Sequence, residues 1–462
     1  MKEVIVRGKK KRMIKPTRQI ALSFLAVIFI GSLLLTLPIA NNGTPARYLD
    51  HLFVATSATC VTGLVPYPTV DQYSLFGQIV ILCLIQIGGL GFLTFMTLIY
   101  VKARKRLSFT SKLVVQEALN VNSLNNLSHF LRNIVIYTFL FEGIGALLLC
   151  SQFIPDYGLF KGLYMGVFHS ISAFCNAGFD IIGASSLVPY QNNLIINFTI
   201  CILIIMGGLG FCVWFDIANK IKEGFSFRKS AVRIFKSLEL HSKLVLTTTV
   251  FLLISGTILV YLLEYKNPNT IGGMDGGYKL MGAFFQSTTL RTAGFATIDC
   301  AQLTVATKFI MCIYMFIGGS PAGTAGGVKT VTFAVIMITL KSLFKGDDNV
   351  NVFKRRIEID FLKRSLCIFI FSLALVVVGL FCLTITEEQS FIDLCFEAFS
   401  GFATVGLTAG LTPSLSDVGK IVIIILMYIG RIGPITMMLS FMRKSQKNTG
   451  NMVFPKGEII IG

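Results

Sequence analysis

Four glycines recur at almost equal spacing along the chain, each within a short segment of the same residue pattern. They are Gly63, Gly178, Gly294 and Gly406, and the intervals between them are 115, 116 and 112 residues. A phenylalanine lies ten residues before each glycine, a serine or threonine lies six residues before it, and a bulky apolar residue follows it. The hydroxyl positions are Ser57, Ser172, Thr288 and Ser400. Matched motifs at a fixed period over the whole chain indicate a fourfold internal duplication.

The chemistry open to these segments is the binding of a dehydrated cation by backbone carbonyl groups. Carbonyl oxygens aimed at a common axis can replace the hydration shell of an ion. Holding them there requires unusual backbone angles, and glycine adopts these easily because it reaches positive φ without steric cost. A short helix that ends just before such a segment directs its partly negative C-terminus at the axis, which favours cations. The spacing therefore predicts four segments that share one ion-binding axis.

The elements that must position the glycines are long and short apolar helices. In each repeat a long apolar run comes first, and a short apolar segment of about ten residues, too short to span a membrane, precedes the glycine. A polar loop and a second long run follow. Stretches of about 20 residues with almost no charge can cross roughly 30 Å of hydrocarbon. They include Ile20–Pro38, Ile79–Val101, Leu194–Phe215, Leu244–Leu263 and Ser365–Ile385. We therefore predict an all-α integral membrane protein with four tandem helix–pore helix–filter loop–helix repeats, hence eight transmembrane helices, around one pseudo-fourfold ion pore.

The same period divides the chain into six parts. They are a basic N-terminal arm (1–18), four pore repeats (19–112, 113–242, 243–358 and 359–447) and a C-terminal tail (448–462). The third repeat contains a Gly- and Pro-rich stretch, Ile317 to Thr330, which cannot hold a continuous helix. At membrane depth such a stretch must be buried in protein or line a cavity, and broken helices commonly mark transport sites. The alternative is a flexible cytoplasmic link.

The composition excludes an ordinary cytosolic enzyme, and the distribution of charge indicates a membrane topology. Of the 462 residues, 54% are apolar and only 14% are charged, against roughly 25% charged in soluble domains. The net charge of +18 comes from basic clusters beside the ends of apolar runs. This positive-inside pattern predicts a multi-pass protein of the cell (plasma) membrane with both termini in the cytoplasm. Membrane lipid explains the positive charge, and we expect no nucleic-acid partner.

Four charged residues inside apolar or motif segments are candidates for further roles. Arg431 lies within an apolar stretch of the fourth repeat, where a charge is costly. It could donate to carbonyls of the broken segment, repel cations, or snorkel to the interface. Arg291 could form a salt bridge with Glu397, and Glu142 could be a structural hydrogen-bonding group or part of an outer vestibule. The sequence has no catalytic cluster, no metal-ligand spacing and no phosphate-loop motif, so we predict no enzyme activity and no nucleotide site in this chain.

The four glycine segments resemble the filter segments of the Trk/Ktr/HKT superfamily of potassium transporters. They read C-V-T-G-L from Cys60, C-N-A-G-F-D from Cys175, R-T-A-G-F-A-T-I-D from Arg291 and A-T-V-G-L-T-A-G-L-T-P from Ala403, and the resemblance covers nearly the whole chain. It implies a filter made of Val61, Thr62, Gly63, Asn176, Ala177, Gly178, Thr292, Ala293, Gly294, Thr404, Val405 and Gly406. It also implies that residues 317–330 form an intramembrane gating loop. The candidate gating residues are Gly318, Gly319, Gly323, Gly326, Gly327, Lys329 and Arg431.

The resemblance further implies potassium uptake through a channel-like pore. In related plant proteins a serine in place of the first filter glycine accompanies sodium transport, so Gly63 favours potassium. The first repeat begins at Ile20, which favours the bacterial Ktr branch and, with it, a homodimer and a cytoplasmic ring of subunits that bind ATP or ADP. Candidate contact segments are 220–243 and 341–364 for the ring and 448–462 for the dimer.

Three questions stay open at this point. Sodium could be an activator of potassium uptake. The chain could instead be a sodium-conducting member of the same superfamily. A secondary transporter of a small solute is a further alternative, although it would require inverted repeats, whereas the four repeats here are all parallel.

Overall fold

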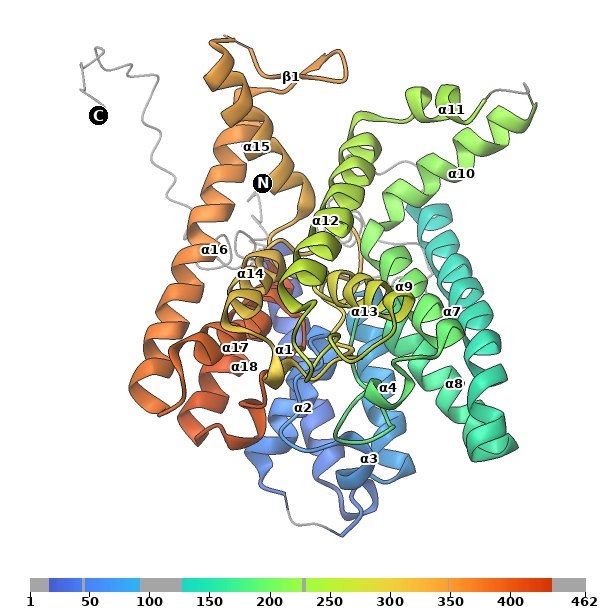
Figure 1. Ribbon diagram of the computed structural model, residues 1–462, viewed down its shortest axis with the longest axis vertical. Coiled ribbons are helices and arrows are strands. Elements are labelled where there is room, and N and C mark those ends of the chain that lie inside the picture. Colours follow the sequence, from blue (N-terminus) through green and yellow to red (C-terminus); the bar gives the residue numbers. More distant parts are fainter. Residues whose placement is uncertain (1–15, 44–45, 92–126, 227–229, 348, 434–462) are drawn as a thin grey trace, which may run out of the picture.

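The computed structural model describes residues 16–43, 46–91, 127–226, 230–347 and 349–433, and these residues are mostly helical (Figure 1). Four long helices begin the four repeats: α1 (Pro16–Thr36), α7 (Leu127–Tyr157), α12 (Leu240–Glu264) and α16 (Ile359–Thr386). Within the described residues, these are the helices long and apolar enough to cross a membrane singly. Their outer faces expose large apolar side chains such as Phe29, Leu147, Leu262 and Phe381. A helix satisfies its own backbone hydrogen bonds, so such a face can contact lipid.

A short helix follows each long one and ends just before the repeated glycine. The short helices are α2 (Tyr48–Cys60), α8 (Leu159–Phe174), α13 (Gly276–Thr289) and α17 (Phe391–Ala403). They have 13 to 16 residues, somewhat longer than the ten or so expected from the sequence. At 1.5 Å per residue they measure about 20–24 Å, which is still less than a bilayer core of roughly 30 Å.

The second helix of each repeat has 12 to 16 residues. These helices are α4 (Leu75–Leu90), α9 (Leu194–Leu209), α14 (Val305–Phe316) and α18 (Asp417–Ile432). The stretch Leu194–Phe215 does not form one straight span, because Gly210 has a φ of +88° and the chain turns there by 98° into α10 (Phe211–Ser226). Gly91 and Gly433 follow α4 and α18 with φ of +81° and +92°. Residues 92–101 of the predicted first-repeat span lie outside the described residues.

The helices of neighbouring repeats pack in a closed cycle. Within each repeat the short helix contacts both the long helix before it and, in the first, second and fourth repeats, the second helix after it. Each second helix also packs against the short helix of the next repeat, as α4 against α8, α9 against α13, and α14 against α17. Finally, α18 of the last repeat packs against α2 of the first. The four repeats therefore surround a common centre.

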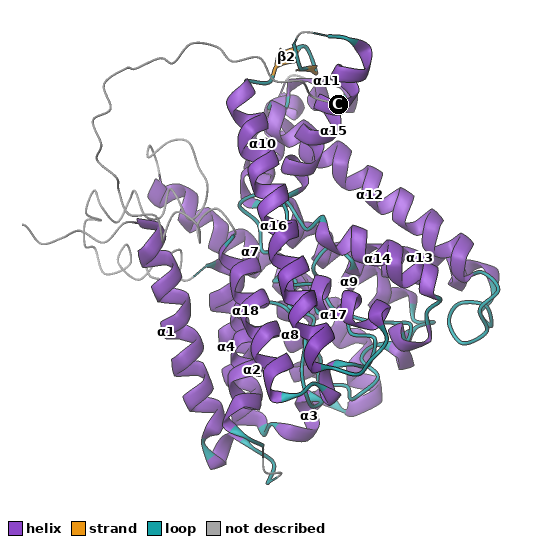
Figure 2. Cartoon of the chain, turned by 90° about the vertical axis from the view of Figure 1, so that its left-hand side faces the viewer, coloured by secondary structure: helices purple, strands orange, loops and turns teal. Residues whose placement is uncertain are grey.

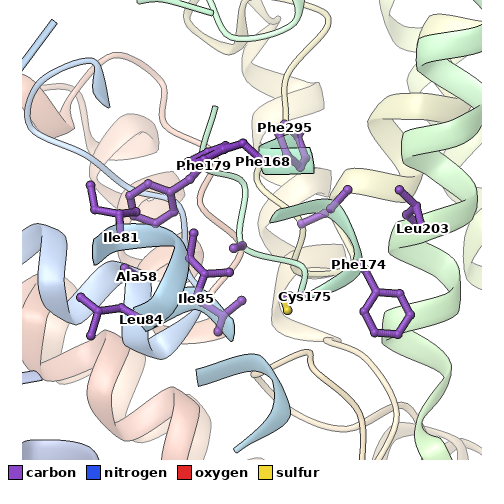
Figure 3. Close-up of a cluster of buried hydrophobic side chains, with 14 of the residues drawn as sticks. Ala58, Ile81, Leu84, Ile85, Phe168, Phe174, Cys175, Phe179, Leu203 and Phe295 are labelled. Atoms are coloured by element: carbon purple, nitrogen blue, oxygen red, sulfur yellow. The ribbon is translucent and has the colours of Figure 1, made fainter. Parts of the chain in front are cut away.

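Buried apolar side chains surround the glycine segments. The bulky residue after each repeated glycine is at most 1% exposed; these are Leu64, Phe179, Phe295 and Leu407. Figure 3 shows the cluster around the second segment, with side chains of the first repeat on one side and of the second on the other: Ala58, Ile81, Leu84 and Ile85, then Phe174 and Leu203. This packing explains the bulky apolar residue in the repeated motif, because it anchors the backbone just beyond each glycine.

The remaining elements lie mostly in the connections. They are α3 (Thr69–Gln72), α11 (Ala231–Ser237), α15 (Thr330–Lys345), the 3-10 turns η1 (Pro38–Ala40), η2 (Val188–Tyr190), η3 (Cys300–Gln302) and η4 (Thr412–Ser414), and the strands β1 (Asn351–Val352) and β2 (Arg355–Arg356). The two strands, each of two residues, form an antiparallel hairpin at one end of the molecule (Figure 2). The two basic segments 220–243 and 341–364 meet at this end, where the rings of Phe235 and Phe353 lie 6.5 Å apart. The tail 448–462 and most of the arm 1–18 lie outside the described residues.

Candidate cation filter and gate

The four repeated glycines meet in a closed ring. A Cβ added to Gly63 would lie 2.6 Å from the carbonyl oxygen of Ala177, and one added to Gly178 would lie 2.6 Å from that of Ala293. In the same way Gly294 faces Val405 O at 2.8 Å, and Gly406 faces the backbone of Thr62. All four glycines have positive φ, between +67° and +101°. A side chain is therefore excluded at each position both by the neighbouring backbone and by the local conformation.

The first residue of each filter segment also has positive φ, which the sequence did not predict. The values are +58° at Val61, +60° at Asn176, +64° at Thr292 and +53° at Thr404. The left-handed region costs a non-glycine residue roughly 1–2 kcal/mol. The middle residue of each segment does not have positive φ, so φ alternates in sign along the segment. Such alternation turns successive carbonyl groups toward the same side, whereas an ordinary extended strand alternates them.

Hydroxyl groups of the short helices hold the filter segments of the first and fourth repeats. The Gly63 amide donates to Ser57 Oγ at 3.0 Å, and the Gly406 amide donates to Ser400 Oγ at 3.1 Å. The middle residues Thr62 and Val405 donate to the carbonyls of the same two serines. The serine six residues before the glycine thus fixes the segment to the end of its short helix.

In the second and third repeats the hydroxyl donates instead to the residue after the glycine. Ser172 donates to Phe179 O at 2.7 Å. In the third repeat the bracing residue is Thr289, which donates to Phe295 O at 2.7 Å, and not the aligned Thr288, which bonds within its own helix. The hydroxyl that holds the segment is thus one residue later in the third repeat, where α13 ends five residues before its glycine, whereas the other short helices end three or four residues before theirs.

Glycines of the second helices allow these helices to approach the filter closely. Gly88, Gly207 and Gly430 each abut a backbone carbonyl four residues before the filter glycine of the same repeat; the carbonyls belong to Thr59, Phe174 and Phe402. Gly318 departs from this arrangement, because it faces Gly326 of the 317–330 segment and the side chain of Thr292. The third repeat is therefore the one in which the second helix gives way to a loop at this level.

The 317–330 segment is a loop that lies against the filter. Its ends pair with each other, because the Gly318 amide donates to Val328 O at 2.9 Å and Ile317 forms a bridge with Val328. Its middle is held by the end of α9, where the Ser320 amide donates to Gly208 O at 2.9 Å. A Cβ on Gly326 would meet the Thr404 hydroxyl, so the loop directly contacts the first filter residue of the fourth repeat.

The other predicted gating residues lie in the same place. Gly319 and Gly323 face α9 at Gly208 and Gly207, and Gly327 faces Ala403 at the end of α17. The Lys329 ammonium donates to Ala325 O within the loop.

Arg431 joins this loop to two helices. From the last turn of α18, its guanidinium donates to Thr324 O of the loop and to Gly88 O of α4. The structure thus favours the carbonyl-donor role among the roles considered for this arginine. The charge-assisted bond to Thr324 O holds the loop more firmly than a neutral one would, and the bond to Gly88 O ties the same guanidinium to α4.

Two other charged residues make different contacts from those considered. Glu397 accepts hydrogen bonds from Thr408 at 2.9 Å and from Thr412, and it forms no ion pair with Arg291. The expected Arg291–Glu397 salt bridge was therefore wrong. The outer nitrogens of the Arg291 guanidinium are buried with no hydrogen-bond partner in the described part of the chain.

Glu142 is a buried hydrogen-bonding group and not part of an outer vestibule. Its side chain is 4% exposed, and it accepts from Gln86 Nε2 at 3.0 Å. It also lies 3.9 Å from the Cys175 sulfur at the end of α8. The carboxylate thus connects two repeats behind the second filter segment.

Two ion pairs between repeats, one buried and one partly buried, were also missed. Lys308 of α14 donates to Asp393 of α17 at 2.8 Å, and Lys420 of α18 donates to Asp50 of α2 at 2.6 Å. The two lysines both lie ten residues before the second-helix glycine, and the two aspartates both lie thirteen residues before the filter glycine. This matched spacing was a usable signal in the sequence.

The chain is similar to known proteins over nearly its whole length. The family model TrkH, described as cation transport protein, matches residues 6–451. The Ktr system potassium uptake protein B of Bacillus subtilis is 40% identical over 97% of this chain and 97% of its own length. The potassium/sodium uptake protein NtpJ of Enterococcus hirae is 39% identical over 99% of this chain and 100% of its own length.

A solved structure also matches. The potassium transporter TrkH from Vibrio parahaemolyticus superposes with a TM-score of 0.73 at 16% identity, over 94% of this chain and 87% of that chain. At this identity the likeness shows the fold alone.

Proposed function

The chain belongs to the TrkH family of cation transport proteins, and from this premise we propose that it takes up potassium as the membrane subunit of a Ktr system. Relatives with about 40% identity over nearly the whole chain are named for potassium uptake. The single observation that carries the proposal is the closed ring of Gly63, Gly178, Gly294 and Gly406. As a member of a transporter family, the chain is not an enzyme.

The twelve predicted filter residues form the ion-binding site in this proposal. Each segment offers backbone carbonyls whose direction is set by a left-handed first residue and a left-handed glycine. Carbonyls so directed can replace the hydration shell of potassium as it passes. The membrane potential supplies about 2.3 kcal/mol per charge per 100 mV, which is enough to drive accumulation.

The proposed architecture is four pore repeats with eight crossings around one pseudo-fourfold axis, divided at the boundaries predicted above. Two observations support it. The same order of long helix, short helix, glycine segment and second helix occurs four times. The contacts between repeats also run in one direction around the ring, from each second helix to the next short helix.

The gate in this proposal consists of the 317–330 loop and Arg431. The loop lies against the first filter residues, and Arg431 holds it there through the carbonyl of Thr324. Conduction then requires the loop to move away from the ring, which breaks the contacts of the arginine.

The proposed topology places both termini and the two basic segments 220–243 and 341–364 in the cytoplasm of a plasma-membrane protein. Support comes from the basic clusters beside the ends of the apolar runs. A Ktr system implies partner subunits, and we propose a homodimer contacted by a cytoplasmic ring that binds ATP or ADP. Sodium is the proposed activator to test first.

A sodium-conducting protein is the second candidate function. It is favoured by the relative NtpJ, whose name includes both potassium and sodium. Gly63 argues for potassium, because a serine there would press against the carbonyl of Ala177 and alter the spacing of the ring.

The test is growth and rubidium uptake at low external potassium in a bacterium that lacks its own potassium systems, with a Ktr-type nucleotide-binding subunit co-expressed. Wild-type chain should rescue growth. Gly63→Ser should reduce the preference for rubidium over sodium by about tenfold or more, since the strained backbone alone is worth 1–2 kcal/mol. Gly143→Ser is the matched control, because a Cβ at Gly143 meets nothing within 4 Å. Sodium uptake without rubidium uptake by the wild type would decide for the second candidate.

A further inference from the structure

The side chain of Asn176 connects the filter to the gate loop. Asn176 is the first filter residue of the second repeat and is 1% exposed. Its Oδ1 accepts a hydrogen bond from the Thr324 hydroxyl at 3.0 Å, and its Nδ2 donates to the carbonyl of Arg291 at 3.1 Å. One buried amide therefore joins the second filter segment, the residue before the third filter segment, and the loop.

The corresponding residues of the other repeats make no such connection. Val61 has no polar group, and the hydroxyls of Thr292 and Thr404 are buried without a hydrogen-bond partner among the described residues. The loop touches Thr404 at Gly326 and Thr292 at Gly318, but only by packing. Among the described residues, the filter is thus hydrogen-bonded to the loop through the second repeat.

Thr324 is the loop residue on which several contacts meet. Its carbonyl accepts from Arg431, its amide donates to Gly207 O at 3.3 Å, and its hydroxyl reaches Asn176 and the carbonyl of Phe174. Any movement of the loop that releases Arg431 displaces this residue. The hydrogen bond to Asn176 must then break, and the left-handed backbone at Asn176 loses its side-chain restraint.

We propose that the Asn176–Thr324 hydrogen bond is a latch that couples the position of the gate loop to the conformation of the second filter segment. The latch rests on the function proposed above. With the loop seated, the segment is held; with the loop displaced, the amide of Asn176 is free to turn. Asn176 and Thr324 are positioning residues, and by linkage a change in the filter affects the loop as much as the loop affects the filter.

The test compares variants of the loop residue in proteoliposomes holding a fixed potassium diffusion potential, without any partner subunit. Thr324→Val removes the hydroxyl at nearly constant size, Thr324→Ser keeps it, and Thr324→Ala is the second removal variant should valine disturb folding. Thr249→Val is the matched control, because the Thr249 hydroxyl is buried without a partner in the described structure. Rubidium uptake and its inhibition by sodium are measured for each.

Loss of the latch should raise basal rubidium uptake about two- to tenfold, the range that one ordinary hydrogen bond can shift a two-state equilibrium. It should also change the sodium inhibition, although Thr324 is not a filter residue; a merely structural loop residue would not have this effect. Thr324→Ser and Thr249→Val should behave as wild type. In the double variant Asn176→Leu/Thr324→Val, the second substitution should add nothing to the first.

Two results would count against the latch in different ways. If both removal variants match wild type in uptake and sodium inhibition, while Gly63→Ser still loses its ion preference, the latch is wrong and the filter stands. If wild-type vesicles take up no rubidium even with the partner subunit added, the proposed function fails and the latch fails with it.

Discussion

Lys420 of α18 donates to the Asp50 carboxylate of α2 at 2.6 Å, and both side chains are almost fully buried, at 4% and 1% exposure. The pair joins the last repeat to the first. Every other pair of neighbouring repeats is consecutive in the chain, so this ion pair lies at the one junction of the ring where the chain itself does not join the two repeats.

Breaking this pair should destabilise the protein strongly. Asp50→Asn leaves the Lys420 charge buried without its partner, and such a change typically costs about 3–5 kcal/mol. The expected result is a clear fall in the melting temperature of the detergent-purified protein. The melting temperature is measured by size-exclusion chromatography of samples heated to increasing temperatures.

The exposed pair Arg47–Asp417 is the control for that measurement, with side chains 62% and 54% exposed. Asp417→Asn should leave the melting temperature nearly unchanged, because solvent screens exposed pairs. Equal effects of the two substitutions would show that the buried pair does not secure the ring.

The filter glycines should not tolerate even one methyl group. Gly178→Ala places a Cβ 2.6 Å from Ala293 O in a backbone of φ +67°. We expect rubidium uptake to fall at least about tenfold, since the left-handed conformation alone costs 1–2 kcal/mol. Gly143→Ala, in open space on α7, should be neutral or slightly stabilising. Normal uptake by Gly178→Ala would mean that the ring is not the conducting site.

Arg431 should act through its two directed hydrogen bonds and not through charge alone. Arg431→Met removes both donors, and charge-assisted bonds are worth about 1.5–3 kcal/mol each. Basal uptake in proteoliposomes should therefore rise by more than about tenfold. Arg431→Lys keeps the charge but cannot reach both carbonyls, so its basal uptake should also rise. If the basal uptake of the lysine variant equals that of the wild type, repulsion of cations is supported as the mechanism.

Substitutions of two adjacent threonines can test which hydroxyl holds the third filter segment. Thr289→Val removes the bond to Phe295 O that fixes the third filter segment, whereas the Thr288 hydroxyl bonds to Phe284 O within α13 and also interacts with Cys201 of α9, but not with the filter segment. We expect the first substitution to reduce the preference for rubidium over sodium by about two- to tenfold and the second to leave it unchanged. If Thr288→Val reduced this preference and Thr289→Val did not, the hydroxyl that aligns with the other repeats would be the one that holds the third filter segment.

The fourfold repeat of the glycine motif made the ring predictable, because equivalent glycines of duplicated segments occupy equivalent positions around the common axis. It could not predict the left-handed backbone of Val61 and Thr404, since these residues rarely adopt it and only the surrounding packing imposes it. The use of Thr289 in place of the aligned Thr288 has the same origin. A helix that ends one or two residues earlier changes which hydroxyl faces the filter, and no local propensity reports this.

The break of the second-repeat span at Gly210 was likewise not visible in composition. The stretch around it is uncharged throughout, and the one signal there was the G-G-L-G sequence, which also ends at Gly91, where α4 stops. The turn at Gly210 depends on a tertiary contact, in which the Phe211 amide donates to Ala322 O of the loop. Hydropathy predicts where apolar segments are, but it cannot show where a loop from another repeat replaces the next helical hydrogen bond.

The four junctions between repeats are not copies of one another. At the position ten residues before the second-helix glycine, Lys308 and Lys420 form ion pairs with the next repeat, and Gln78 accepts a hydrogen bond from Tyr164. Within the described residues, the hydrogen bonds of the Asn197 side chain stay in its own repeat. A channel assembled from four identical subunits would have to carry any such change in all four. Fusion into one chain lets each repeat mutate independently. One blocking loop or one stabilising contact can therefore arise in a single repeat without appearing in the other three.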